Sequence, residues 1–254
     1  MITAGIDMGA KTLKILILKD SEVLAKDIAI GGLEEKKVAE ELFEAVLKKV
    51  GLSRGDLAHV VATGAGRQAA PYFDDEITEI GAAAKGTSFL FPSVRTVIEV
   101  GAEEGRGTRV NENRKVTDFV INEKCAAGAG AFTESMARAM EVPLEDFARM
   151  SLKSTKAIPM NAQCAVFAES EVVSLVHAKT SKEDIARAVH DALAERIISM
   201  VRRVGIEKDV ALIGGMARNP GFIDSLQRGL ELEVLVPQDP EFVGALGAAL
   251  AAAG

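Results

Sequence analysis

Two cysteines carry the most distinctive chemistry in this sequence. Cys125 stands in the segment NEKCAAGAGAF and Cys164 in the segment NAQCAVFAESEV. Each precedes an expected helix, and a helix N-terminus stabilises a thiolate. Two thiolates cannot complete a tetrahedral zinc site or a four-iron cluster, whereas two copies of a chain around a two-fold axis supply four. Residue chemistry alone leaves open that both cysteines are inert core residues.

A glycine turn near the N-terminus is suited to binding phosphate. Gly5 and Gly9 flank Asp7 at the end of an apolar strand, where backbone N–H groups can approach phosphate closely. Asp7 is the expected catalytic carboxylate and holds Mg²⁺ through water. The other residues of this turn expected to bind the nucleotide are Ala10, Lys11, Thr12 and Lys14. The alternative is a plain β-hairpin.

A second turn repeats this arrangement with more acidic residues. Glu99, Glu103 and Glu104 surround Gly101 and Ala102, and the three carboxylates are candidates for positioning Mg²⁺ or an attacking water. Gly101 and Ala102 are the expected phosphate contacts. The alternative is that Glu103 and Glu104 are exposed turn charges.

Two further glycine segments lie near the C-terminus. The first follows an apolar strand and opens an expected helix, which suits flat contact with a nucleobase or ribose. The second lies in the last helix, where small residues allow close approach to another backbone. The nucleotide-binding candidates here, with Glu134 from the helix after Cys125, are Gly214, Gly215, Met216, Asn219, Gly244 and Gly247.

The elements that position these residues fall into two similar halves. Each half opens with three strands, expected at 2–8, 12–19 and 22–30 and at 94–100, 105–110 and 116–121. Further strands are expected at 56–63, 210–213 and 232–236, and helices at 34–50, 78–89, 129–141, 162–178, 182–204, 217–230 and 241–252. We expect an α/β protein with two duplicated lobes, 1–95 with 240–254 and 96–239, and a nucleotide cleft between them.

Composition excludes several classes of protein. The 254 residues are 48% hydrophobic but only 4% aromatic, which indicates an aliphatic core. The net charge of −7 gives no reason to expect nucleic acid. The sequence shows no run long enough to span a membrane and no export signal, so we expect a cytoplasmic protein without a structural disulfide.

The ordered set of glycine segments resembles the actin/Hsp70/sugar-kinase (ribonuclease H-like) ATPase fold. The words KCAAGAGAF and QCAVFAESEV, together with GIDMGAKTLK, VATGAGR, LIGGMARNPG and VGALGAAL, resemble the BadF/BadG/BcrA/BcrD ATPase family over nearly the whole chain. That resemblance implies ATP/ADP, Mg²⁺ and a [4Fe–4S] cluster held by Cys125 and Cys164 and shared between two subunits. It also implies a homologous ATPase subunit as mate, a ferredoxin or flavodoxin donor, and catalytic acyl-CoA reductase or dehydratase subunits.

The second turn decides between family members. Dehydratase activators typically have DIGGQD where this chain has EVGAEE, whereas GAEEGR looks more like the D-type subunit of benzoyl-CoA reductase. We therefore expect an ATP-hydrolysing electron-activator subunit of an acyl-CoA reductase. The alternatives are a homodimeric activator of a 2-hydroxyacyl-CoA dehydratase, a small-molecule kinase of the same fold, and an interaction module that binds ATP without hydrolysing it.

Overall fold

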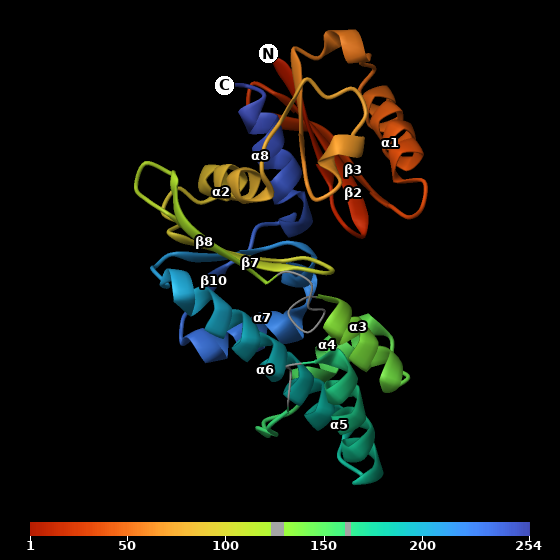
Figure 1. Ribbon diagram of the computed structural model, residues 1–254, viewed down its shortest axis with the longest axis vertical. Coiled ribbons are helices and arrows are strands. Elements are labelled where there is room, and N and C mark those ends of the chain that lie inside the picture. The colour runs from red at the N-terminus through yellow and green to blue at the C-terminus, as the bar shows by residue number, and fades with distance from the viewer. Residues whose placement is uncertain (123–129, 161–163) are drawn as a thin grey trace. The chain divides into compact units, whose positions relative to one another are not determined.

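The computed structural model describes residues 1–122, 130–160 and 164–254 and divides into two compact units. Unit 1 comprises Met1–Val94, Val110–Thr117 and Glu241–Gly254, and unit 2 comprises Arg95–Arg109 and Asp118–Pro240. Each unit is built on one five-stranded sheet with helices packed on it (Figure 1). The expected α/β class is confirmed.

The sheet of unit 1 has the strand order β3-β2-β1-β4-β5. Antiparallel pairing joins β1 to β2 and β2 to β3, whereas β4 pairs parallel to β1 and β5 parallel to β4. The strands are β1 (Ile2–Met8), β2 (Thr12–Lys19), β3 (Glu22–Ile30), β4 (His59–Thr63) and β5 (Asp75–Glu76). The first three match the expected strands because tight turns at 9–11 and 20–21 separate strongly apolar runs.

The sheet of unit 2 repeats this plan. Its order is β10-β9-β6-β7-β8, with β7 antiparallel to β6, β9 parallel to β6 and β10 parallel to β9. Its strands are β6 (Thr96–Val100), β7 (Gly105–Val110), β8 (Val116–Asn122), β9 (Val210–Ile213) and β10 (Val234–Leu235). Both sheets thus place the opening strand at the centre, which confirms the expected duplication.

Helices cover the two faces of the first sheet. On one face α1 (Glu35–Lys49) buries Phe43 and Val46 against Ile6 and Ile15. On the other face α8 (Val243–Ala251) packs on β1, β2 and β4, and α2 (Glu79–Leu90) packs on α8. The small residues of α8 permit this contact: a Cβ on Gly247 would lie 1.8 Å from the carbonyl oxygen of Ala82. The expected close approach of this helix is confirmed.

Unit 2 holds the longest helix and the largest apolar core. Helix α6 (Lys182–Val201) packs against α4 and α7, and Phe132, Phe147 and Phe222 are fully buried in the same core. The remaining helices are α3 (Gly130–Ala139), α4 (Leu144–Ser151), α5 (Ala165–His177) and α7 (Pro220–Leu230). None of the described helices is long and apolar enough to cross a membrane.

Two local differences from the sequence-based expectation have simple causes. The sequence does not predict helix α4, because eight residues are too few to display a clear helical period. The helix expected near 217–230 begins only at Pro220, after a 3₁₀ turn at Gly215–Arg218. Asn219 ends that turn and caps α7, and proline suits the first helical position.

Candidate functional site

The predicted catalytic Asp7 lies at the end of β1 beside Lys14 of β2. The two residues are register partners across the antiparallel pair, and Lys14 Nζ lies 3.2 Å from Asp7 Oδ2. Both side chains are mostly shielded from solvent. A Cβ on Gly9 would lie 2.9 Å from Lys14 Nζ, so the absence of a side chain there makes room for the ammonium group. Three residues expected to act together are therefore brought together.

Helix α8 begins next to the same carboxylate. A Cβ on Gly244 would lie 3.1 Å from Asp7 Oδ2, so only glycine leaves this oxygen open toward α8. Gly5, a predicted nucleotide contact, lies inside β1, and a Cβ there would lie 1.9 Å from the carbonyl oxygen of Ala245. Gly5 therefore serves the packing of α8. Of the turn residues, Ala10 and Lys11 are exposed and Thr12 is half-buried.

Unit 2 contains a second acid–base pair at the equivalent place. Glu99 of β6 is the register partner of Arg106 of β7, and Glu99 Oε2 lies 3.1 Å from Arg106 Nη1. Arg106 also pairs with Glu104 through Nη2. The arginine is only 8% exposed, so it links two of the three predicted catalytic carboxylates of the second turn from within the sheet. The third, Glu103, is exposed.

Sequence reasoning misses Arg106 as a site residue, although a signal for it is present. A tight turn at 101–104 places residue 99 opposite residue 106, and opposite charges facing each other across antiparallel strands attract. The same geometry joins Asp7 to Lys14 in unit 1. The acid–base pair is thus a duplicated feature of both sheets.

The second turn is hydrogen-bonded to the start of α3. The backbone N–H groups of Gly130 and Ala131 donate to the carbonyl oxygens of Gly101 and Ala102, at 2.9 and 2.8 Å. Gly101 N–H in turn donates to the Glu104 carbonyl at 2.9 Å, which closes the turn. Two predicted phosphate contacts therefore also anchor a helix. The predicted Glu134 lies on this helix and is half-buried.

The third glycine segment needs its first glycine for a structural reason. Gly214 has φ +87°, and a Cβ there would lie 2.6 Å from the carbonyl oxygen of Val100. Gly64 shows the same features in unit 1, with φ +94° and a Cβ position 2.4 Å from the carbonyl of Met8. Gly215 is exposed, and no described atom lies within 4 Å of its Cβ position. Gly215 therefore has room for a ligand.

The side chains of Met216 and Asn219, two predicted nucleotide contacts, make contacts inside unit 2. Met216 is 6% exposed, and its sulfur lies 3.7 Å from the Thr133 hydroxyl of α3. Asn219 Oδ1 accepts a hydrogen bond from Phe222 N–H at the start of α7. Asn219 Nδ2 lies 3.1 Å from His190 Nε2. Sequence reasoning misses this role because it expects the helix to open at the glycine pair.

His190 is fully buried beneath Asn219. Its Nδ1 lies 2.7 Å from the Ala186 carbonyl, which can only accept, so Nδ1 carries the proton and Nε2 accepts from Asn219. Burial lowers the pKa of His190 to about 4, against the opposing effects of the Ala186 carbonyl, Asp191 and Asn219. His190 is therefore a neutral structural residue.

Cys164 is the N-cap residue of α5, and its backbone is extended with φ −141° and ψ 134°. Its side chain is half-buried and forms no disulfide. The predicted position of Cys164, directly before a helix, is confirmed. Cys125 lies outside the described residues, five positions before α3, which packs against α5. Among the described residues, no group of three or more histidine, cysteine and acidic side chains forms a metal site.

The duplicated sheets with a central acid-bearing strand define the class of the protein. A glucokinase of the ROK family from Streptomyces griseus has the same fold, with a TM-score of 0.64 at 15% identity over 100% of this chain and 99% of that one. At this identity only the fold is shared, which confirms the actin/Hsp70/sugar-kinase ATPase fold. More specifically, the chain belongs to the BadF/BadG/BcrA/BcrD ATPase family, whose family model matches residues 4–252.

Several relatives are similar over their whole length. The (R)-2-hydroxyglutaryl-CoA dehydratase activating ATPase of Acidaminococcus fermentans is 40% identical over 98% of this chain and 95% of its own. The 2-hydroxyisocaproyl-CoA dehydratase activator of Clostridioides difficile is 35% identical over 98% and 94%. The D-type benzoyl-CoA reductase subunit of Thauera aromatica is 30% identical over 98% and 92%.

A solved structure of one such activator gives the same result. The activator of the 2-hydroxyisocaproyl-CoA dehydratase from Clostridium difficile, with bound ADPNP, matches with a TM-score of 0.92 and 35% identity. The match covers 99% of this chain and 94% of that one. The comparisons therefore favour the alternative of a dehydratase activator over the expected benzoyl-CoA reductase subunit.

Proposed function

We propose that this chain is an ATP-hydrolysing activator that delivers electrons to a 2-hydroxyacyl-CoA dehydratase. The observation that carries the proposal is the identity of 35–40% with three dehydratase activators over nearly the whole chain, against 30% with the D-type benzoyl-CoA reductase subunit. The family relationship and the ADPNP-bound relative support binding of ATP and ADP. The duplicated acid–base pairs supply groups suited to phosphate and to a divalent cation.

In this proposal each unit carries its own groups suited to the nucleotide. Asp7 carries the negative charge that attracts a hydrated Mg²⁺, and Lys14 beside it can turn to a phosphate oxygen. The Glu99 and Glu104 carboxylates orient the attacking water, and Arg106 holds both in place. Gly215 leaves open space for the nucleoside. The nucleotide cleft itself and the finer roles of these residues stay predictions.

The cysteines are the proposed ligands of a [4Fe–4S] cluster, which accepts and passes on single electrons when bound. Cys164 fits this role as a half-buried thiol at a helix N-terminus, and Cys125 precedes the helix that packs on α5. Two cysteines from each of two chains complete the four ligands. A ferredoxin or flavodoxin is the proposed donor, and the dehydratase is the proposed acceptor.

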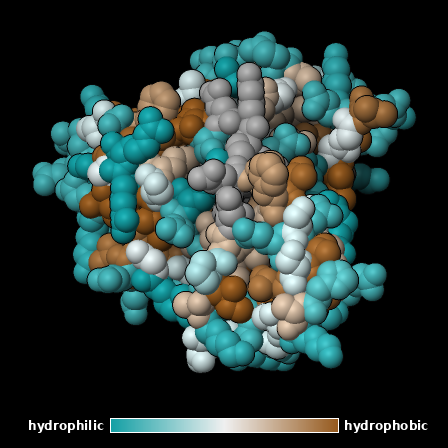
Figure 2. All heavy atoms as spheres, turned by 60° about the horizontal axis from the view of Figure 1, so that its bottom comes forward, coloured by the Kyte–Doolittle hydropathy of each residue, from teal (hydrophilic) through white to brown (hydrophobic). Residues whose placement is uncertain are grey.

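The surface of α5 supports a second copy of this chain as the mate. Four large apolar side chains are exposed along the helix that Cys164 caps: Val166 at 69%, Phe167 at 65%, Val173 at 44% and Val176 at 47%. Apolar patches also appear among polar groups on the face in Figure 2. A symmetric contact beside Cys164 buries this surface and brings the two sets of thiols together.

A route for coupling hydrolysis to the cluster runs through α3. The second turn accepts hydrogen bonds from Gly130 and Ala131, which begin this helix. Thr133, one turn further, contacts Met216 next to the Gly214-Gly215 segment. A change in the turn when the terminal phosphate leaves is therefore transmitted to α3, which follows Cys125. Nucleotide state can shift the cluster's environment only through such differential contacts.

The test is anaerobic purification followed by iron and sulfide analysis, ATP hydrolysis, and activation of a 2-hydroxyacyl-CoA dehydratase. The wild-type chain is expected to hold about four irons per dimer, and Cys125→Ala or Cys164→Ala to lose them while ATP binding persists. A colourless wild-type protein that phosphorylates a small molecule would instead identify a kinase. Stable co-purification with acyl-CoA reductase subunits would return the assignment to the benzoyl-CoA reductase type, which the segment GAEEGR favours.

A further inference from the structure

Thr63, at the end of β4, lies in the same row of the sheet as Asp7 and Lys14. It is the register partner of Asp7 across the parallel pair β1–β4, and Asp7 in turn faces Lys14 of β2. Partners on adjacent strands lie about 5 Å apart. Thr63 is therefore the neighbour of the Asp7 carboxylate on the side opposite Lys14.

The side chain of Thr63 points to the same face of the sheet as Asp7. Two residues earlier, Val61 packs against Ala248 of α8, whereas Val60 and Ala62 pack into the core beneath α1. Alternation along a strand puts Thr63 on the α8 face with Val61. Asp7 is on this face as well, because its carboxylate lies against Gly244 of α8.

The Thr63 hydroxyl is buried and unpaired within the part of the chain that the structure describes. Thr63 is 1% exposed, and its Oγ1 makes no hydrogen bond to any described residue. A buried hydroxyl left unpaired destabilises the folded state, because it gives up its hydrogen bonds to water and gains none in return. A valine of the same shape avoids this loss, so packing alone gives no reason for threonine.

The second unit shows that the fold does not require a hydroxyl at this place. Ile213 occupies the equivalent position, at the end of β9 and paired with Glu99 of β6. It is apolar and 1% exposed. The glycines that follow, Gly64 and Gly214, have the same positive φ and the same packing, so the two positions are matched. The hydroxyl belongs only to the unit that carries Asp7.

We propose that Thr63 is a positioning residue for the cation site at Asp7, where its hydroxyl hydrogen-bonds a water in the hydration shell of Mg²⁺. A hydrated magnesium ion keeps several waters at about 2.1 Å, and each water reaches an oxygen about 2.8 Å further away. A hydroxyl one strand spacing from the carboxylate matches that reach. The unpaired hydroxyl is the observation that fits such a ligand, and the inference rests on the nucleotide binding proposed above.

The experiment compares Thr63→Val with the wild-type chain by titrating ADP calorimetrically in excess Mg²⁺ and again in EDTA. Thr63→Val is expected to bind ADP roughly three- to tenfold more weakly in Mg²⁺, the range for one hydrogen bond, and equally well in EDTA. The midpoint of thermal unfolding without nucleotide is expected to stay the same or rise, because an unpaired buried hydroxyl is removed. Thr63→Ser keeps the hydroxyl and should retain the Mg²⁺-dependent affinity.

Thr87→Val is the matched control. Thr87 lies in α2 of the same unit, is 0% exposed, and its hydroxyl also has no hydrogen-bond partner among the described residues. The same chemical change there should leave ADP affinity unchanged. Equal affinity of Thr63→Val and wild type in Mg²⁺ would overturn the inference, and so would an equal loss in Mg²⁺ and EDTA. A wild-type chain that binds no ADP would overturn the proposed function itself, and the inference with it.

Discussion

Arg106 forms ion pairs with two carboxylates of unit 2. It is nearly buried and pairs with Glu99 and Glu104, which are 21% and 34% exposed. Removing the cation leaves two poorly solvated carboxylates close together, which mutual repulsion and lost hydrogen bonding both disfavour. The same residue thus serves stability and the proposed orientation of the attacking water.

Arg106→Gln is expected to lower the free energy of unfolding by roughly 1–3 kcal/mol and to reduce ATP hydrolysis more than tenfold. Denaturant titration and a phosphate-release assay measure the two effects. The control is Arg149→Gln, which breaks an exposed pair with Glu145 on α4. It should cost less than about 1 kcal/mol and leave hydrolysis intact. Full activity of Arg106→Gln would exclude the proposed role.

His190 should make the protein sensitive to mild acid. Its pKa is lowered to about 4 by burial, so between pH 6.5 and 4 the unfolded chain takes up a proton that the folded chain does not. This effect of His190 on the free energy of unfolding is therefore absent above pH 6.5. Between pH 6.5 and 4 it lowers the free energy of unfolding by about 1.4 kcal/mol for each pH unit that the pH falls.

The pKa of Asp184 is lowered to about 2 by Lys156, Ser154 and Ser181, so its stabilising effect is lost only below its ordinary value of 3.8.

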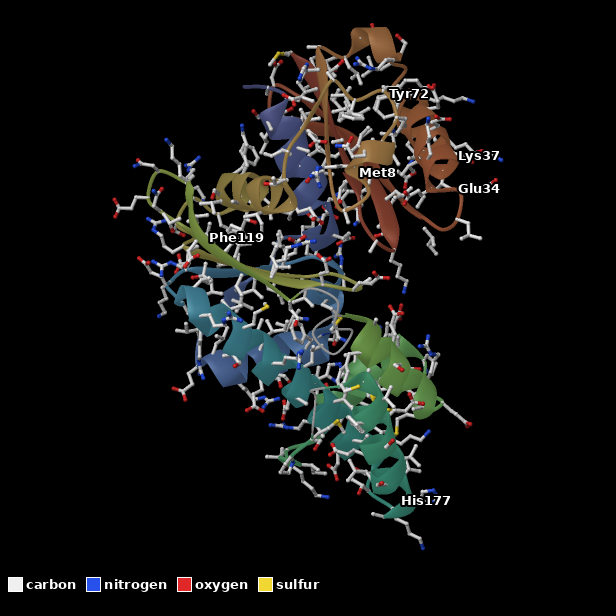
Figure 3. All side chains as sticks on the ribbon, viewed as in Figure 1. Met8, Glu34, Lys37, Tyr72, Phe119 and His177 are labelled. Carbon is white, nitrogen blue, oxygen red and sulfur yellow. The ribbon has the colours of Figure 1, made fainter. Side chains whose placement is uncertain are left out.

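His190→Gln is expected to be less stable than wild type at pH 7, because a flexible amide cannot donate to the Ala186 carbonyl and accept from Asn219 in the geometry of the ring. It should show a flatter pH profile between 6.5 and 4. Denaturant titrations across this range measure the slope. His177→Gln is the control, since His177 is exposed at the end of α5 (Figure 3). Wild-type and His190→Gln slopes that coincide would show that His190 does not govern the acid limb.

Helix α3 links elements that are distant in sequence. Its first two N–H groups donate hydrogen bonds to the carbonyl oxygens of Gly101 and Ala102. N–H groups in the first turn of a helix have no acceptor within the helix, and here two of them stabilise the second turn. Proline is tolerated in the first turn of a helix and lacks an N–H. A proline at position 131 therefore removes one hydrogen bond between α3 and the turn while leaving the helix able to form.

Ala131→Pro is expected to retain ATP binding and the cluster but to lose most of the coupling between hydrolysis and dehydratase activation. The measurement is the number of ATP molecules hydrolysed per electron delivered, which should rise severalfold. Ala131→Ser keeps the N–H and should behave as wild type. An unchanged ratio in Ala131→Pro would show that nucleotide state reaches the cluster by another route.

At the scale of the whole molecule, the exposed apolar side of α5 is the feature that points beyond one chain. Phe167 lies three residues after the N-cap cysteine and is 65% exposed. A charged side chain at this position would be solvated in a monomer, but it would be costly to bury in an apolar contact between two chains. The proposed shared cluster requires that contact.

Phe167→Glu is expected to leave the fold intact and to convert a dimer to a monomer that lacks iron, measured by sedimentation and iron analysis under anaerobic conditions. Leu33→Glu is the control, because Leu33 is fully exposed in unit 1 and lies outside the proposed contact. Its mass and iron content should match the wild type. A Phe167→Glu protein that remains an iron-containing dimer would place the mate elsewhere.

The sequence by itself determined the features that depend on neighbouring residues. Apolar strands broken by glycine and polar turns predicted most strands along the chain, the duplication and the acid at the end of each opening strand, whereas the order within each sheet and the short strand β5 came from the structure. Words such as QCAVFAESEV identified the family, because local segments keep the chemistry of a site. The short segment EVGAEE favoured the benzoyl-CoA reductase type, whereas identity along the whole chain favours the dehydratase activators. A few turn residues carry less information than the whole chain.

Hairpin register, for which the sequence carries a signal, decided which charged side chains face each other, and tertiary packing alone decided the contacts between distant segments. Lys14 faces Asp7 and Arg106 faces Glu99 because turn length sets the register, and a slip of one residue would send each to the opposite face. The burial of Asn219 against His190 and the isolation of the Thr63 hydroxyl depend on packing between segments far apart in the chain. Such contacts arise from long-range packing, which no local pattern of residue types encodes.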